Sequence, residues 1–159
     1  MPSHSSIEEA AHEAWDAGNL RVAFSLFTEC VKTGSVGCMV NLGYFYDEGL
    51  GVKQDKGRAM YWYKRAYRQG EGAAASNIAI LYREAGRRAL TYQWFCRAAD
   101  LGDGDAEVEV ARLLAAGMGV RRSVPLALAA LKRARLSRNI TPGGREEAAN
   151  LAASLRSAA

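Results

Sequence analysis

The sequence has few of the residues from which metal centres and catalytic sites are built. Its 159 residues include two histidines and three cysteines. Neither His4 nor His12 has a partner at the short spacing that is typical of zinc ligands. A nucleophilic serine or cysteine needs a base beside it, and no recognisable pair of that kind is present. We therefore expect no metal, no cofactor and no catalytic residue, and predict that the chain is not an enzyme.

Long apolar runs are also missing. No uninterrupted stretch approaches the roughly 18 apolar residues of a membrane-spanning helix. The N-terminus has no basic segment followed by an apolar one, so it does not resemble a signal peptide. Glycine-rich phosphate loops and dinucleotide fingerprints are absent as well. We expect a cytoplasmic protein that does not bind a membrane.

What the sequence does contain is a repeated helical pattern. Residues 36–70 form two amphipathic helical patterns joined by a Gly-rich turn, and weaker copies lie on both sides. Asn41 aligns with Asn77, which sets a period of 36 residues. One helical pair has too little apolar surface for a core of its own, so the pairs are predicted to stack on their neighbours. Small residues stand where the two helices of a pair would cross most closely: Gly43, Ala79 and Ala111.

Two of the turns share one sequence pattern. Residues 49–55, GLGVKQD, reappear as residues 117–123, GMGVRRS. The first and third residues of each turn are glycines, which adopt positive φ without the steric cost that other residues incur. We predict that Asp55 and Ser123 are the N-caps of the helices that follow, and that Pro125 lies in a first helical turn.

These residues together resemble the Sel1-like repeat, a relative of the tetratricopeptide repeat. The resemblance is strong over residues 36–70 and weaker over 105–135, where Leu114 and Leu131 replace aromatic residues. The opening and middle pairs have the shorter turns of tetratricopeptide units. The resemblance implies an all-α fold, a right-handed α-α superhelix (solenoid) of about four helix pairs, at residues 7–34, 36–70, 73–102 and 104–138.

Both ends of the chain depart from the repeat pattern. Residues 1–6 are predicted to form a flexible N-terminal tail. At the other end the pattern breaks over residues 141–144 and resumes from Arg145 to Ser157 as an Ala-rich amphipathic helix. We interpret residues 141–159 as a C-terminal capping helix that covers the apolar face of the last repeat.

The resemblance also implies where a partner would bind. In tetratricopeptide-like stacks the first helix of each pair lines a concave face, and Asn41 and Asn77 would lie there one repeat apart. An Asn side chain offers a donor and an acceptor, which suits the backbone of an extended peptide, although either Asn could instead bond a neighbouring helix. The predicted partner-binding residues are Asn41, Tyr44, Asp47, Ser76, Asn77, Ile80, Arg83, Glu109 and Arg112.

The three cysteines allow two interpretations. Cys30 and Cys38 have the spacing of the bridge between adjacent pairs in the cysteine-rich secreted branch of the Sel1-like family, so the resemblance makes them a candidate disulfide. The spacing occurs only once here, and a cytosolic chain would keep both thiols reduced as small buried apolar groups. Cys96 is interpreted as a core residue.

Charge is distributed unevenly along the chain, whose net charge is +4. Residues 1–50 carry two basic and seven acidic side chains, whereas residues 51–138 carry 17 basic and eight acidic ones. The basic side chains could face an acidic partner or a phosphate backbone, or simply be solvated outer faces of helices. Most aromatic residues fall at packing positions, so we do not expect nucleic-acid binding. The basic flank comprises Arg83, Arg87, Arg88, Arg121, Arg122, Lys132, Arg133, Arg135 and Arg138.

The leading functional hypothesis is a non-enzymatic adaptor or scaffold that binds a protein or peptide in its concave groove. Family resemblance implies roles in assembling signalling, secretion or quality-control complexes. One alternative is the β-lactam binding or hydrolysis suggested for the secreted branch, which the missing cysteine pairs and leader disfavour. Another is polyanion binding through the basic flank.

Overall fold

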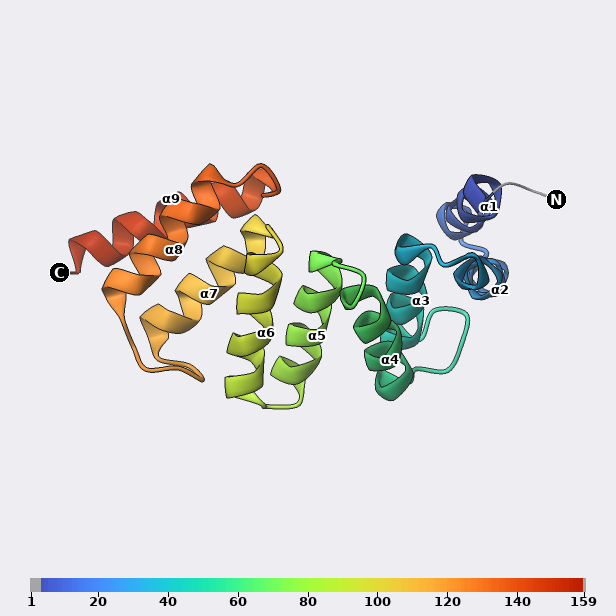
Figure 1. Ribbon diagram of the computed structural model, residues 1–159, viewed down its shortest axis with the longest axis horizontal. Helices are drawn as coiled ribbons and strands as arrows, with labels where there is room; N and C mark the ends of the chain where they lie inside the picture. Colours follow the sequence, from blue (N-terminus) through green and yellow to red (C-terminus); the bar gives the residue numbers. More distant parts are fainter. Residues whose placement is uncertain (1–3, 159) are drawn as a thin grey trace. The chain divides into compact units, whose positions relative to one another are not determined.

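The computed structural model describes residues 4–158, with side chains from Ser6 onward, and this part of the chain is helical (Figure 1). The all-α fold that the repeat pattern predicts is confirmed. The helices fall into two compact units, of which the first ends at Glu71 and the second begins at Gly72. The first contains α1 (His4–Asp16), α2 (Leu20–Cys30), the short 3-10 helix η1 (Val31–Thr33), α3 (Val36–Glu48) and α4 (Lys56–Tyr67). The second contains α5 (Gly72–Glu84), α6 (Arg88–Asp100), α7 (Gly104–Ala116), α8 (Val124–Leu136) and α9 (Pro142–Ser157).

Aromatic rings fill the core of the first unit. The Trp15 ring of α1 lies 5.0 Å from that of Phe45 on α3, and Phe27 of α2 lies 5.2 Å from the same ring. These edge-on contacts are the geometry that aromatic quadrupoles favour. Three helices are therefore joined through one cluster of rings.

Two helices of this unit, α3 and α4, cross at close range. Tyr63 of α4 is fully buried and lies directly against Gly43 of α3. A Cβ atom at Gly43 would come within 2.6 Å of the Tyr63 ring, which is closer than carbon atoms approach. The small residue predicted at this crossing is thus the one that admits the large ring.

The two glycine-rich turns pack in the same way in their respective units. Gly51 has a φ of +65° and lies against the Leu20 carbonyl at the start of α2. Gly119 has a φ of +75° and lies against the Arg88 carbonyl at the start of α6. Any Cβ at either position would collide with that backbone, so both the conformation and the close approach require glycine.

The predicted helix caps are confirmed. The Asp55 side chain accepts a hydrogen bond of 2.9 Å from the Arg58 backbone N–H. The Ser123 hydroxyl accepts one of 3.3 Å from the Leu126 N–H, and Pro125 lies in the first turn of α8. Each cap satisfies one of the backbone donors that a helix start leaves free.

In the second unit, α9 packs on both α7 and α8 and buries Ala148 and Ala152. The helix begins at Pro142, three residues before the predicted start at Arg145. The Thr141 hydroxyl explains the difference, because it caps the helix by accepting a 3.0 Å hydrogen bond from the Gly144 N–H. The two glycines that seemed to break the pattern are part of the first helical turn.

Part of the predicted N-terminal tail is helical. Residues 4–6 are helical and belong to α1, which begins at His4. The rest of the predicted tail, residues 1–3, lies outside the described residues.

The Gly43–Tyr63 contact leads to a stability prediction. Gly43→Ala should lower the free energy of unfolding by about 1–3 kcal/mol, because an added methyl group overpacks the crossing. Gly143→Ala is the matched control, since its Cβ would meet no atom within 4 Å. Thermal unfolding followed by circular dichroism tests this, and equal melting temperatures for the two variants would contradict it.

Candidate functional site

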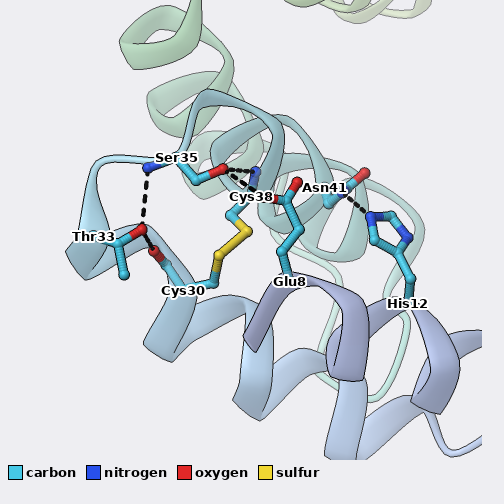
Figure 2. The surroundings of a disulfide bond; sticks show 7 residues. All are labelled: Glu8, His12, Cys30, Thr33, Ser35, Cys38 and Asn41. Atoms are coloured by element: carbon cyan, nitrogen blue, oxygen red, sulfur yellow. Dashed lines mark hydrogen bonds between the residues drawn. A yellow bond between two sulfur atoms is a disulfide. The ribbon is translucent and has the colours of Figure 1, made fainter. Parts of the chain in front are cut away.

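The predicted binding residues of the first unit have different surroundings. The Asn41 side-chain amide lies 3.3 Å from Nε2 of His12, so the α3 residue is bonded to the neighbouring helix α1 (Figure 2). Tyr44 is 39% exposed, and its ring lies 5.7 Å from that of Trp15. Tyr44 therefore presents an aromatic edge to solvent, whereas the amide of Asn41 is partly engaged within the fold.

Asp47, one of the predicted partner-binding residues, does not lie on an accessible surface, and its role in binding stays a prediction. The residue is only 6% exposed. Its carboxylate accepts a 3.2 Å hydrogen bond from the Tyr63 hydroxyl and forms an ion pair with Lys56. The helical register places Asp47 on the same helix as Tyr44, but only the packing of α4 against α3 reveals that the carboxylate is enclosed.

Cys30 and Cys38 are joined by a disulfide in the structure. The sulfur atoms are 2.06 Å apart and the Cα atoms 6.0 Å apart, and the bond links the end of α2 to the first turn of α3. Both residues are fully buried. Cys96 is a free thiol on α6, partly buried, and burial raises its pKa above the usual value. A thiol that remains protonated is a poor nucleophile.

Four predicted residues line a single hollow of the second unit. This hollow has a volume of about 350 Å³ and lies among α5, α6, α7 and α9. Ile80 and Phe95 supply apolar surface, and polar groups surround them. The predicted residues that line the hollow are Ser76, Ile80, Arg83 and Glu109.

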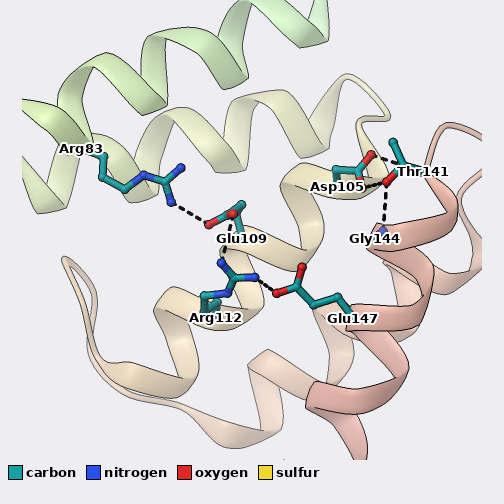
Figure 3. Close-up of polar contacts among 7 residues, drawn as sticks. All are labelled: Arg83, Asp105, Glu109, Arg112, Thr141, Gly144 and Glu147. Carbon is teal, nitrogen blue, oxygen red and sulfur yellow. Dashed lines mark hydrogen bonds and ion pairs between the residues drawn. The ribbon is translucent and has the colours of Figure 1, made fainter.

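Charged side chains of α5, α7 and α9 alternate in a row beside this hollow (Figure 3). Arg83 of α5 bonds Glu109 of α7 at 3.1 Å, and Arg112 bonds the other oxygen of Glu109 at 3.3 Å. Arg112 also pairs with Glu147 of α9. Single exposed pairs of this kind contribute about 0–1 kcal/mol, so their main effect is to hold the side chains in place. The four residues, Arg83, Glu109, Arg112 and Glu147, are called the charge ladder below.

Hydrogen bonds at helix ends fix the rim of the hollow. The Ser76 hydroxyl donates a 2.7 Å bond to Asp103, the N-cap of α7. At the start of α9, the Thr141 hydroxyl and backbone N–H donate to the two oxygens of Asp105, at 2.7 and 3.0 Å. These hydrogen bonds hold the polar side chains around the hollow in defined positions. Asn77 lies half-buried on α5.

The side chains of the basic flank have different surroundings and partners. Arg133 binds both carboxylate oxygens of Glu107, at 2.8 and 3.1 Å. Arg122 donates a 2.9 Å bond to the Ala115 carbonyl. Lys132 and Arg135 instead line a larger hollow between α8 and α9, with a volume of about 850 Å³. The lining of this hollow, called the α8–α9 groove below, also includes Arg145, Arg156, Leu128, Leu136 and Ile140.

Part of the chain is similar to a known repeat family. A family model described as the Sel1 repeat matches residues 36–71 and 88–103. These two segments of the chain are similar to the Sel1 repeat. The first match covers the pair in which the sequence resemblance is strongest. The second covers α6 rather than residues 105–135, where the resemblance is weaker. Sel1 repeat proteins are generally protein–protein interaction modules and typically non-enzymatic helical scaffolds.

Two solved structures of Sel1 repeat proteins share the fold. A Sel1 repeat protein from Oxalobacter formigenes is 24% identical over 81% of this chain, with a TM-score of 0.73. The protective antigen c5321 of uropathogenic Escherichia coli is 26% identical over 84%, with a TM-score of 0.75. This chain spans 55% of the first structure and 30% of the second. No curated protein is significantly similar to it.

Some site features carried no signal in the sequence. Glu147 lies in the capping helix, outside every repeat, and its contact with Arg112 depends on how α9 packs. Asp105 and Thr141 are 36 residues apart in sequence.

None of the described helices in residues 4–158 is long and apolar enough to cross a membrane.

The Tyr63–Asp47 contact makes the free energy of unfolding depend on pH in the alkaline range. Burial, followed by the nearby Asp47 charge, raises the pKa of Tyr63 well above its ordinary value of 10. Above about pH 10 the unfolded chain loses the Tyr63 proton while the folded chain keeps it, so the free energy of unfolding falls as the pH rises. Tyr63→Phe should reduce this fall.

Denaturant unfolding from about pH 8 to about pH 11 measures this dependence on pH. Tyr61→Phe is the control, because Tyr61 lies on the same helix but is 53% exposed. If Tyr63→Phe and Tyr61→Phe lose stability equally above pH 10, the explanation is incorrect.

Proposed function

We propose that this protein is a non-enzymatic cytoplasmic adaptor that binds a protein or peptide partner through the first helices of its repeats. The observation that supports the proposal most directly is the hollow of the second unit, where Ser76, Ile80, Arg83 and Glu109 meet. The repeat register predicts all four of them. Interaction through a helical-repeat surface is also the general role of the family.

The chemistry of the hollow suits a mixed apolar and polar segment. Ile80 and the Phe95 ring provide an apolar floor, and the Arg83 guanidinium lies 5.2 Å above that ring. The charge ladder presents both signs of charge close together, so it favours a partner with paired donors and acceptors over a uniformly charged one. Asn41 belongs to the first unit and Asn77 to the second, and their joint role in binding stays a prediction.

Substitution of Ile80 tests the proposed surface. Partners captured by crosslinking in the native cell and identified by mass spectrometry would be purified and their affinities measured. Ile80→Glu should weaken the binding of a true partner at least tenfold, about 1.4 kcal/mol, because it puts a charge on the apolar floor. Ile80→Ala is the milder variant, for use if the charge impairs folding.

Leu126→Glu is the matched control, because Leu126 is 58% exposed and does not line this hollow. It should bind like the wild type. Circular dichroism establishes that each variant is folded. Unchanged affinity in both Ile80 variants would exclude the hollow as the binding surface.

The α8–α9 groove supports a second candidate function, the binding of an acidic partner. Its lining includes Lys132, Arg135, Arg145 and Arg156 but a single acidic residue, Glu146. The other lining residues are apolar, and a nucleic-acid backbone would leave them uncovered. An acidic segment with apolar side chains would complement both features.

Retention on immobilised heparin tests whether this groove attracts anions. Lys132→Glu/Arg156→Glu should elute at a lower salt concentration than the wild type, because two cations of the groove are replaced. Arg138→Glu removes an exposed charge that does not line the groove and should change retention less. Equal retention of the wild type and the double variant would refute this candidate.

A further inference from the structure

Three side chains that can bind metal ions meet where α1, α2 and α3 come together. Glu8 belongs to α1, Cys30 ends α2, and Cys38 lies in the first turn of α3. Among the described residues, a carboxylate oxygen and the two sulfur atoms all lie within 4.8 Å of one another. Figure 2 shows the Glu8 carboxylate beside the sulfur pair.

The position of Glu8 is defined by its neighbours on the α3 side. The Ser35 hydroxyl donates a 3.0 Å hydrogen bond to one Glu8 oxygen, and the same hydroxyl accepts a 3.2 Å bond from the Cys38 N–H. The other Glu8 oxygen lies where a Cβ atom at Gly37 would be only 2.6 Å away. The first turn of α3 therefore has room for the carboxylate because residue 37 is glycine. A negative charge is also favoured at this helix N-terminus.

We propose that Glu8, Cys30 and Cys38 form a binding site for a thiophilic divalent cation such as Zn²⁺ when the disulfide is reduced. Two sulfurs and one carboxylate oxygen are ligands that Zn²⁺ accepts, and a water molecule would occupy the fourth position. The buried sulfurs suit a soft cation better than Mg²⁺ or Ca²⁺, which prefer oxygen ligands.

A dithiol can reduce the Cys30–Cys38 disulfide and so open the site. The dithiol gives two electrons and two protons to the Cys30–Cys38 bond, which breaks to two thiols while the reductant becomes a disulfide. Binding of the cation then releases the two thiol protons to solvent and leaves two thiolate ligands. Their negative charges match the charge of the cation, so the buried site acquires no net positive charge.

The distances suit such a site. Sulfur atoms bound to Zn²⁺ at about 2.3 Å in tetrahedral geometry lie roughly 3.8 Å apart. The sulfurs must therefore separate from their 2.06 Å bond, while a Glu8 carboxylate oxygen already lies within 4.8 Å of both. The disulfide connects α2 with α3, whereas the cation would also hold α1 through Glu8. The same cysteines would thus tie the helices together in a reducing compartment.

Cobalt is the probe for this site, because Co²⁺ bound by thiolates has a charge-transfer absorption band. The full chain would be reduced with a phosphine, separated from the reductant under argon and titrated with Co²⁺. We expect one Co²⁺ per chain with the thiolate band, displacement by Zn²⁺, and no band in the oxidised chain. Cys30→Ser should abolish the band.

Matched variants on α1 test the role of Glu8. Glu8→Gln should weaken Co²⁺ binding at least roughly tenfold, because it removes the carboxylate ligand. Glu13→Gln makes the same change at an exposed position of the helix and should bind like the wild type. Circular dichroism of the reduced proteins establishes that both are folded. A reduced chain without the thiolate band, or equal Co²⁺ affinity in the two variants, would overturn the proposal.

Discussion

The crossing of α3 and α4 is the contact on which much of the first unit depends. Gly43 admits the Tyr63 ring into the interface, and the ring is fully buried there. A buried hydroxyl needs a hydrogen-bond partner, which Asp47 supplies, and Asp47 is in turn paired with Lys56. One close approach of two helices thus explains a small residue, an aromatic residue and an enclosed carboxylate.

In the second unit, bonds at helix starts bring together the surface proposed to bind a partner. Asp103 begins α7 and receives the Ser76 hydroxyl, while Thr141 begins α9 and bonds Asp105. These contacts connect α5, α7 and α9, the three helices from which the charge ladder extends. A partner would meet side chains whose positions are already set, which lowers the entropy lost on binding.

Local features of the sequence predict much of this structure. The glycines of the two similar turns, the caps at Asp55 and Ser123, and the small residue at Gly43 all follow from conformational and steric preferences within a few residues or one repeat. The structure adds to or differs from these predictions where contacts cross between helices. Asp47 is enclosed by a residue 16 positions away, and α9 begins early because Thr141 caps it.

The all-α repeat fold, its turns and its helix caps follow from the amino-acid sequence, because periodicity and turn chemistry act over short distances along the chain. Which polar side chains meet depends on the packing of the helices. The Glu8 bond to Ser35 spans 27 residues, and the Asp105 bond to Thr141 spans 36. Such contacts depend on how separate helices pack, and side-chain patterns within one helix do not encode that packing.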